Sequence, residues 1–337
     1  MQIKSKILFL VVIFLMITLK HSLAQQNRLS SYHFSDYADT KSSAMGFTAV
    51  SNPFSPMSYK SNPANLSFDS DINLYGGEVE DEFVFSSSTS INGYGIALDY
   101  AYTNYIAYAT PIFDITSDFY SNDYHNIFYS ISLSKEILKD FAIGTSLTLL
   151  DFNNDVSYKI NLGTLYKIEN PFNSSIVKNE LYFGFAINNI GPDIETEFDD
   201  IYLPIYASIG STFRLISGDK SLFAYAFEAS LKYKNYLNPS SNDNRYFLAY
   251  RNEKTERDYW GIGFELTLFK LISIRDGYYK SPFRNNIAHT GGIGIHFPPK
   301  VTKFSISLEY MRYWNDRPYF WRRGIYLGSI NFAYRLD

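Results

Sequence analysis

One stretch near the C-terminus combines Trp, Tyr and Arg, the residue types that dominate binding hot spots in protein interfaces. All three types recur between positions 313 and 323. The same types would also form an aromatic girdle at a membrane interface, with the arginines facing lipopolysaccharide. Both interpretations place the stretch in an outer loop, and its candidate partner-binding residues are Trp314, Arg317, Tyr319, Trp321 and Arg322.

Histidines and carboxylates elsewhere form no recognisable metal site. No two histidines show the i, i+4 spacing of a helical zinc site. Carboxylates crowd positions 193–200 and could bind Ca²⁺ through oxygen ligands, but they lack the spacing of an EF-hand, and a solvated loop is the simpler explanation. We therefore expect no bound metal.

Catalytic arrangements are also missing. The sequence contains no Gly-x-Ser-x-Gly elbow. The glycine-rich run at 291–294 lies within a strand pattern, without the strand–turn–helix context of a phosphate loop. We expect no enzyme and no cofactor. The net charge of −4, without a basic cluster, gives no support for nucleic-acid binding.

The elements that must position any site are strands with one apolar face and one small or polar face. In residues 259–268, bulky apolar side chains alternate with Gly, Glu and Thr. A period of two places successive side chains on opposite faces of a sheet. This parity places Lys159 and Glu265 on the polar face. The pattern predicts fourteen strands, near residues 72–78, 82–89, 93–103, 125–135, 141–151, 156–167, 180–188, 204–214, 221–233, 258–268, 271–278, 287–297, 303–312 and 324–336.

The N-terminus and the composition indicate an outer-membrane protein. Met1–Ala24 has the charged start, apolar core and small-residue cleavage site of a secretory signal peptide, with an uncleaved membrane anchor as the alternative. The chain has no cysteine, which excludes a lipoprotein anchor and disulfides. No later stretch reaches the roughly 18 apolar residues of a spanning helix. A membrane form would then be a closed barrel, whose interfacial girdles would use the 18% aromatic residues.

Loop lengths favour the same interpretation. The connections predicted at 104–124, 189–203, 234–257 and 313–323 are long, and short ones lie between them along the chain. Outer-membrane barrels have short periplasmic turns and longer outer loops. We therefore predict an all-β transmembrane antiparallel barrel of about fourteen strands, with both strand ends in the periplasm.

Several short motifs resemble the PorV/PorQ family, within the FadL-like barrels. Ala44-Met45-Gly46 and Asn62-Pro63-Ala64 resemble its N-terminal signature, although Phe47-Thr48 stands where the family usually has Gly-Ala. Later matches follow in family order: Phe183 to Pro192, Leu203-Pro204 with Gly210, Ile274 to Tyr279, and Gly292 to Ile295.

The resemblance implies a fourteen-stranded barrel with its N-terminal segment folded into the lumen as a plug. A lumen of this width is too large for wall side chains to fill, which gives an independent reason for a plug. We expect a signal peptide at 1–24, a plug at 25–71 and a barrel at 72–337. A flexible periplasmic tail is the alternative for the plug.

The resemblance also implies two functions. PorV-like members serve the type IX secretion system of Bacteroidetes, where they bind translocon partners or secreted cargo. FadL-like members transport long-chain fatty acids or other hydrophobic compounds. The small and polar lumen-facing residues favour the secretion scaffold at this point, with the hydrophobe transporter as its alternative. Outer-membrane lipid is a partner in both.

Overall fold

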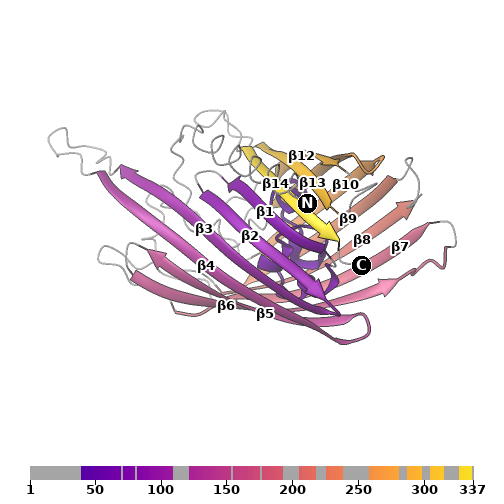
Figure 1. The fold of residues 1–337 in the computed structure, drawn as a ribbon, viewed down its shortest axis with the longest axis horizontal. Coiled ribbons are helices and arrows are strands. Elements are labelled where there is room, and N and C mark those ends of the chain that lie inside the picture. Colours follow the sequence, from indigo (N-terminus) through magenta and orange to yellow (C-terminus); the bar gives the residue numbers. More distant parts are fainter. Residues whose placement is uncertain are drawn as a thin grey trace, which may run out of the picture.

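The computed structural model describes residues 39–69, 71–79, 82–108, 121–152, 155–174, 177–192, 205–217, 225–237, 258–280, 287–297, 304–314 and 326–335. Within these residues, fourteen antiparallel strands close into one barrel, which confirms the predicted fold class (Figure 1). The strands are β1 (Asp71–Val79), β2 (Glu82–Ile91), β3 (Tyr94–Tyr108), β4 (Ser121–Leu138), β5 (Phe141–Phe152), β6 (Asp155–Glu169), β7 (Lys178–Ile190), β8 (Tyr206–Ser217), β9 (Tyr225–Tyr236), β10 (Asp258–Leu268), β11 (Ile272–Lys280), β12 (Ile287–Phe297), β13 (Phe304–Trp314) and β14 (Tyr326–Arg335).

The barrel closes because its first and last strands pair along their whole common length. The β1–β14 register runs from Asp71 opposite Arg335 to Val79 opposite Leu327. Closure leaves no strand edge with unpaired backbone groups. We refer to the end of the barrel where β1 begins and β14 ends as the terminal end, and to the other as the opposite end.

The two faces of the wall separate as the alternation predicts. On β10, Phe264 and Leu266 are 37% and 40% exposed, whereas Glu265 between them is 7% exposed. Lys159 is also buried on the inner face, so the predicted parity of both charged residues is confirmed. The outer face is apolar around the barrel; its exposed side chains include Leu74, Leu98, Ile131, Leu133, Ile209, Leu231, Ile274, Ile293 and Leu308.

The connections follow the predicted length rule only in part. Those between β3 and β4, β7 and β8, β9 and β10, and β13 and β14 are long, and they join strand ends at the opposite end of the barrel. Two others at that end, β1 to β2 and β5 to β6, span only two residues, at 80–81 and 153–154. Loop length therefore depends on the strand pair as well as on the end of the barrel.

Residues 39–69 form short helices inside the ring of strands, coloured indigo in Figure 1. We refer to these residues as the lumen segment. Almost all of it is buried, although it contains many polar residues. Its elements are α2 (Thr40–Ala44), η3 (Ala49–Ser51), η4 (Ser58–Lys60) and η5 (Pro63–Phe68). The proposed signal peptide and residues 25–38 of the proposed plug lie outside the described residues.

Candidate functional site

Asp39 organises the start of the lumen segment. Its side chain caps α2 by accepting a hydrogen bond from the Ser42 backbone N–H at 2.9 Å. It also accepts hydrogen bonds from the Ser55 hydroxyl at 2.5 Å and from the Met57 N–H at 3.3 Å. One buried carboxylate thus joins α2 to the chain that precedes η4, which gives the segment a defined shape despite its few regular elements.

The Ala44-Met45-Gly46 motif forms the closest approach of this segment to β10–β12. Thr290 on β12 donates to the Ala44 carbonyl at 3.0 Å and accepts from the Gly46 N–H at 3.1 Å. Gly46 has φ +69°, and a Cβ there would lie 2.7 Å from the carbonyl oxygens of Ile262 and Tyr278. Only glycine fits such a position, because it lacks the side chain that would meet the wall.

Phe47 adopts a conformation that suits glycine better. Its φ is +62°, in the left-handed region that costs an ordinary residue energy. The buried ring packs edge-on against Tyr279 of β11, with ring centroids 4.8 Å apart. The contact with Tyr279 therefore accompanies a backbone conformation that is strained for a residue with a side chain.

The Asn62-Pro63-Ala64 motif begins η5 and attaches it to the wall. The Asn62 side chain accepts from the Ala64 N–H at 3.1 Å, and Pro63 occupies the first helical turn. The Asn62 amide donates to the Val50 carbonyl at 2.7 Å and to the Thr164 carbonyl of β6 at 2.9 Å. Both halves of the predicted plug motif are thus contact points between the segment and the barrel.

Wall glycines allow the backbone of the lumen segment to approach the strands directly. At each of them, an added Cβ would lie closer than 3.0 Å to an atom of the segment. Several are cross-strand neighbours, such as Gly144 opposite Gly163 and Gly263 opposite Gly277. We refer to them as the glycine track: Gly95, Gly144, Gly163, Gly184, Gly210, Gly261, Gly263, Gly277 and Gly292.

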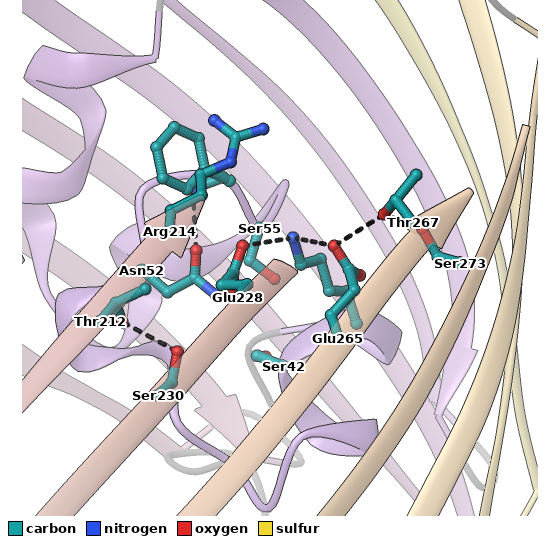
Figure 2. Close-up of polar contacts among 12 residues, drawn as sticks. Ser42, Asn52, Ser55, Thr212, Arg214, Glu228, Ser230, Glu265, Thr267 and Ser273 are labelled. Atoms are coloured by element: carbon teal, nitrogen blue, oxygen red, sulfur yellow. Dashed lines mark hydrogen bonds and ion pairs between the residues drawn. The ribbon is translucent and has the colours of Figure 1, made fainter. Parts of the chain in front are cut away.

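A buried charge cluster joins α2 to the wall. Glu228 of β9 and Glu265 of β10 are directly opposite in register, an arrangement of like charges that destabilises a sheet. Their side chains point toward the same space beside the lumen segment (Figure 2). Lys41 occupies that space, with its ammonium 3.2 Å from Glu228 and 3.0 Å from Glu265. Burial alone would lower the pKa of Lys41, but the two carboxylates outweigh it and the pKa is raised.

The cluster continues along the inner face. Arg275 of β11 forms ion pairs with Glu265 and with Glu309 of β13. The Asn52 amide of the lumen segment donates a hydrogen bond to one carboxylate oxygen of Glu228, and the Lys41 ammonium approaches the other. The wall and the segment therefore share one network in which Lys41 supplies the cation between two adjacent carboxylates.

A second polar contact lies on the other side of the lumen. Tyr59 of η4 donates its hydroxyl to Asp99 of β3 and contacts the hydroxyl of Ser86 on β2. Burial, together with the Asp99 charge, raises the pKa of Tyr59 well above its usual value, so the phenol stays a hydrogen-bond donor.

Next to this contact, four apolar side chains form a continuous row on the inner wall of β2–β5. Val84 is opposite Ala101, Ala101 opposite Phe128, and Phe128 opposite Leu150. All four are buried and belong to one apolar cluster with Met57 and Tyr59 of the lumen segment. We refer to them as the apolar row. Val84 lies near the start of β2 and Leu150 near the end of β5, so the row faces the opposite end of the barrel.

The predicted outer-loop site lies outside the described residues, except for the backbone of Trp314 at the end of β13. Sequence reasoning missed Lys41, Glu228 and Asp99. The only signal in the sequence was a charged residue at a position of the polar strand face, for Glu228 and Asp99, or within the proposed plug, for Lys41. In the described part of the chain, no group of three or more metal-ligating side chains is present, and no helix is long and apolar enough to cross a membrane.

No family model matches the chain, and no curated protein does. Among solved structures, the Ralstonia pickettii toluene transporter TbuX is 10% identical over 90% of this chain and 99% of its own, with a TM-score of 0.48. The CymD monoaromatic hydrocarbon channel is 10% identical over 89% of this chain and 98% of its own, with a TM-score of 0.45. A Pseudomonas aeruginosa FadL homologue is 10% identical over 90% of this chain and 98% of its own, with a TM-score of 0.41. The PorV/PorQ resemblance finds no support in these comparisons and stays a hypothesis. The described residues form a closed fourteen-stranded antiparallel β-barrel, and its neighbours among solved structures include a toluene transporter, a monoaromatic hydrocarbon channel and a FadL homologue.

Proposed function

We propose that this chain is an outer-membrane barrel that binds a hydrophobic compound on the outer side of an N-terminal plug and passes it inward. The observation that carries the proposal is the apolar row, which borders the lumen segment on the side of the long connections. The row packs against Met57 and Tyr59, so movement of this part of the lumen segment would expose a continuous apolar surface to the lumen.

The outer face supports the membrane location. Apolar side chains on every part of the barrel are about half exposed, for example Leu98 at 56% and Ile293 at 52%. A soluble protein rarely exposes a continuous apolar surface of this extent. A closed barrel satisfies all backbone groups internally, which is the condition for strands to cross a bilayer.

The lumen segment is proposed as the plug. It contacts the wall through the glycine track, the charge cluster around Lys41 and the Tyr59–Asp99 contact. These contacts involve strands on opposite sides of the ring, so the segment obstructs the lumen at this level. Passage of a compound therefore requires part of the segment to move.

The proposal is tested with N-phenyl-1-naphthylamine, a neutral hydrophobic fluorophore, and the protein in lipid nanodiscs. We expect saturable fluorescence above that of empty nanodiscs. Phe128→Ala should weaken it about ten- to a hundredfold, the range for removing one large apolar contact. Phe185→Ala is the matched control, because Phe185 is 43% exposed on the lipid-facing side.

The rate at which the fluorophore enters cells carrying each variant reports passage, and we expect Phe128→Ala to slow it. Absence of saturable binding would overturn the proposal. Equal effects of Phe128→Ala and Phe185→Ala on binding would overturn it as well, because they would place the binding outside the lumen.

A second candidate function is an accessory of protein export, as the PorV/PorQ resemblance implies. The extent of the buried contacts around the lumen segment favours it, because a scaffold can keep its lumen filled. Purification in mild detergent tests this candidate. It requires secretion partners to be recovered with the native protein and lost when Trp321 and Arg322 are both replaced by Ala; recovery of bound lipid alone would exclude it.

A further inference from the structure

A polar row lies one step from the apolar row along the same four strands, and Tyr59 of the lumen segment contacts it. Its members are again cross-strand neighbours: Ser86 opposite Asp99, Asp99 opposite Ser130, and Ser130 opposite Thr148. Residues two apart on a strand share a face and lie roughly 6.5 Å apart. A molecule that displaced Met57 and Tyr59 from the apolar row would therefore reach the polar row with its other end.

Asp99 is the one charged member of this polar row. It is 7% exposed; Oδ1 accepts the hydrogen bond from Tyr59, Ser86 also hydrogen-bonds the carboxyl group, and the charge of Lys60 acts on it. The second oxygen, Oδ2, has no hydrogen-bond partner among the described residues. A buried carboxylate oxygen without a donor is costly, so a purely structural role as acceptor for Tyr59 leaves half of the group unexplained.

The surroundings of Oδ2 define the chemistry that would satisfy it. A carboxylate accepts hydrogen bonds and attracts positive charge, so it favours an ammonium or a hydroxyl and repels another carboxylate. Val84 and Ala101 lie one step along the same two strands as Ser86 and Asp99. An apolar wall that ends at an acceptor fits an amphipathic molecule whose head group donates hydrogen bonds.

We propose that Asp99 is the head-group site for the hydrophobic compound, and that it selects alkyl or aryl molecules with an ammonium or hydroxyl head over fatty acids. This inference rests on the proposed function, because it assumes that a hydrophobic compound binds at the apolar row. It names the substrate class of that site and assigns its selectivity to one residue.

Four ligands with the same eight-carbon chain test the proposal: octylammonium, 1-octanol, octanoate and n-octane. Each competes with N-phenyl-1-naphthylamine for the protein in nanodiscs, with empty nanodiscs as the baseline. Octylammonium and 1-octanol should bind more tightly than octane, and octylammonium about ten- to a hundredfold more tightly than octanoate, the range for a charge-assisted hydrogen bond.

Asp99→Asn should remove the preference for octylammonium over octanoate while octane binds as before. The matched control is Asp276→Asn, which makes the same change on the outer face of β11, where Asp276 is 48% exposed. Tyr59→Phe is the second variant; it leaves the Asp99 charge in place and should keep the preference, whereas a purely structural Asp99 would make both variants behave alike.

The outcomes separate this inference from the proposed function. If all four ligands bind with equal affinity, or if Asp99→Asn keeps the preference, the head-group site is wrong and the hydrophobe-binding function stands. If the fluorophore itself shows no saturable binding, the proposed function fails and this inference fails with it.

Discussion

Replacing Lys41 by Met should release the lumen segment from the wall. The substitution keeps most of the apolar stem and removes the cation that lies 3.2 Å from Glu228 and 3.0 Å from Glu265. Glu265 would keep its ion pair with Arg275, but Glu228, which lies opposite it in register, would lose its ion pair with Lys41. Removing one partner of a buried ion pair typically costs about 3–5 kcal/mol, because the remaining charge is left uncompensated.

The absence of cysteine from the chain makes this loss measurable at a single site. Ser43 in α2 is fully buried, and its hydroxyl has no hydrogen-bond partner among the described residues, so Ser43→Cys should be tolerated. Reaction of this thiol with a maleimide reports opening of the segment. A loss of about 3–5 kcal/mol corresponds to labelling that is roughly a hundredfold to a few thousandfold faster.

Two further variants give the experiment its controls. Lys178→Met removes a lysine at the start of β7 whose side chain is 58% exposed, outside the charge cluster, and should change the labelling rate by much less. Combining Lys41→Met with Glu228→Gln should recover part of the loss, because one of the opposed charges is gone. If Lys41→Met labels no faster than the parent Ser43→Cys protein, the charge cluster does not hold the segment and this reasoning is refuted.

Two other predictions concern fit and pH. Gly184→Ala would place a methyl group against the backbone of Val50 and Ser51, so it should lower the temperature at which the barrel unfolds in a heat-modifiability gel. Gly328→Ala is the control and should not lower this temperature, because a Cβ there meets no atom within 4 Å. Equal shifts of the unfolding temperature would reject the glycine track as a contact surface. Burial raises the pKa of Asp69, between η5 and β1, from 3.8 to about 7. Between these two pH values the folded protein therefore binds more protons than the unfolded chain. The stability of the folded protein should then fall as the pH rises from about 4 to about 7. Asp69→Asn should flatten this dependence in urea unfolding at pH 5 and pH 7.5, and an unchanged slope would contradict it.

Strand positions could be predicted because an apolar and a polar face alternate along every strand. For β10 and β12 the predicted bounds match the observed ones. The bounds of β9 (predicted at 221–233, observed at Tyr225–Tyr236) and of β4 differ most; β4 is predicted at 125–135 and observed at Ser121–Leu138. Its backbone ladder continues past the last apolar alternation, through Lys135 and Glu136, because cross-strand hydrogen bonds do not depend on side-chain polarity.

The candidate site was less accessible to prediction. Parity placed Glu265 inside the barrel, but its contact with Lys41 depends on how the lumen segment crosses the ring, which no local pattern reports. The apolar row depends on the register of four strands, so its members are neighbours only after the barrel has formed. This row reverses the order of the two functional hypotheses, because the sequence favoured a lumen lined only by small and polar residues.

The position of the lumen segment constrains the order in which the chain assembles. The segment precedes β1, yet it contacts strands from β2 around the ring to β14. The seam between β1 and β14 forms from the first and last strands of the sheet. Because the segment is buried against nearly every strand, we expect the sheet to curl around it before the seam closes. The segment would then act as a template for the curvature of the growing sheet. Its deletion should slow ring closure during biogenesis, even where the completed barrel is stable.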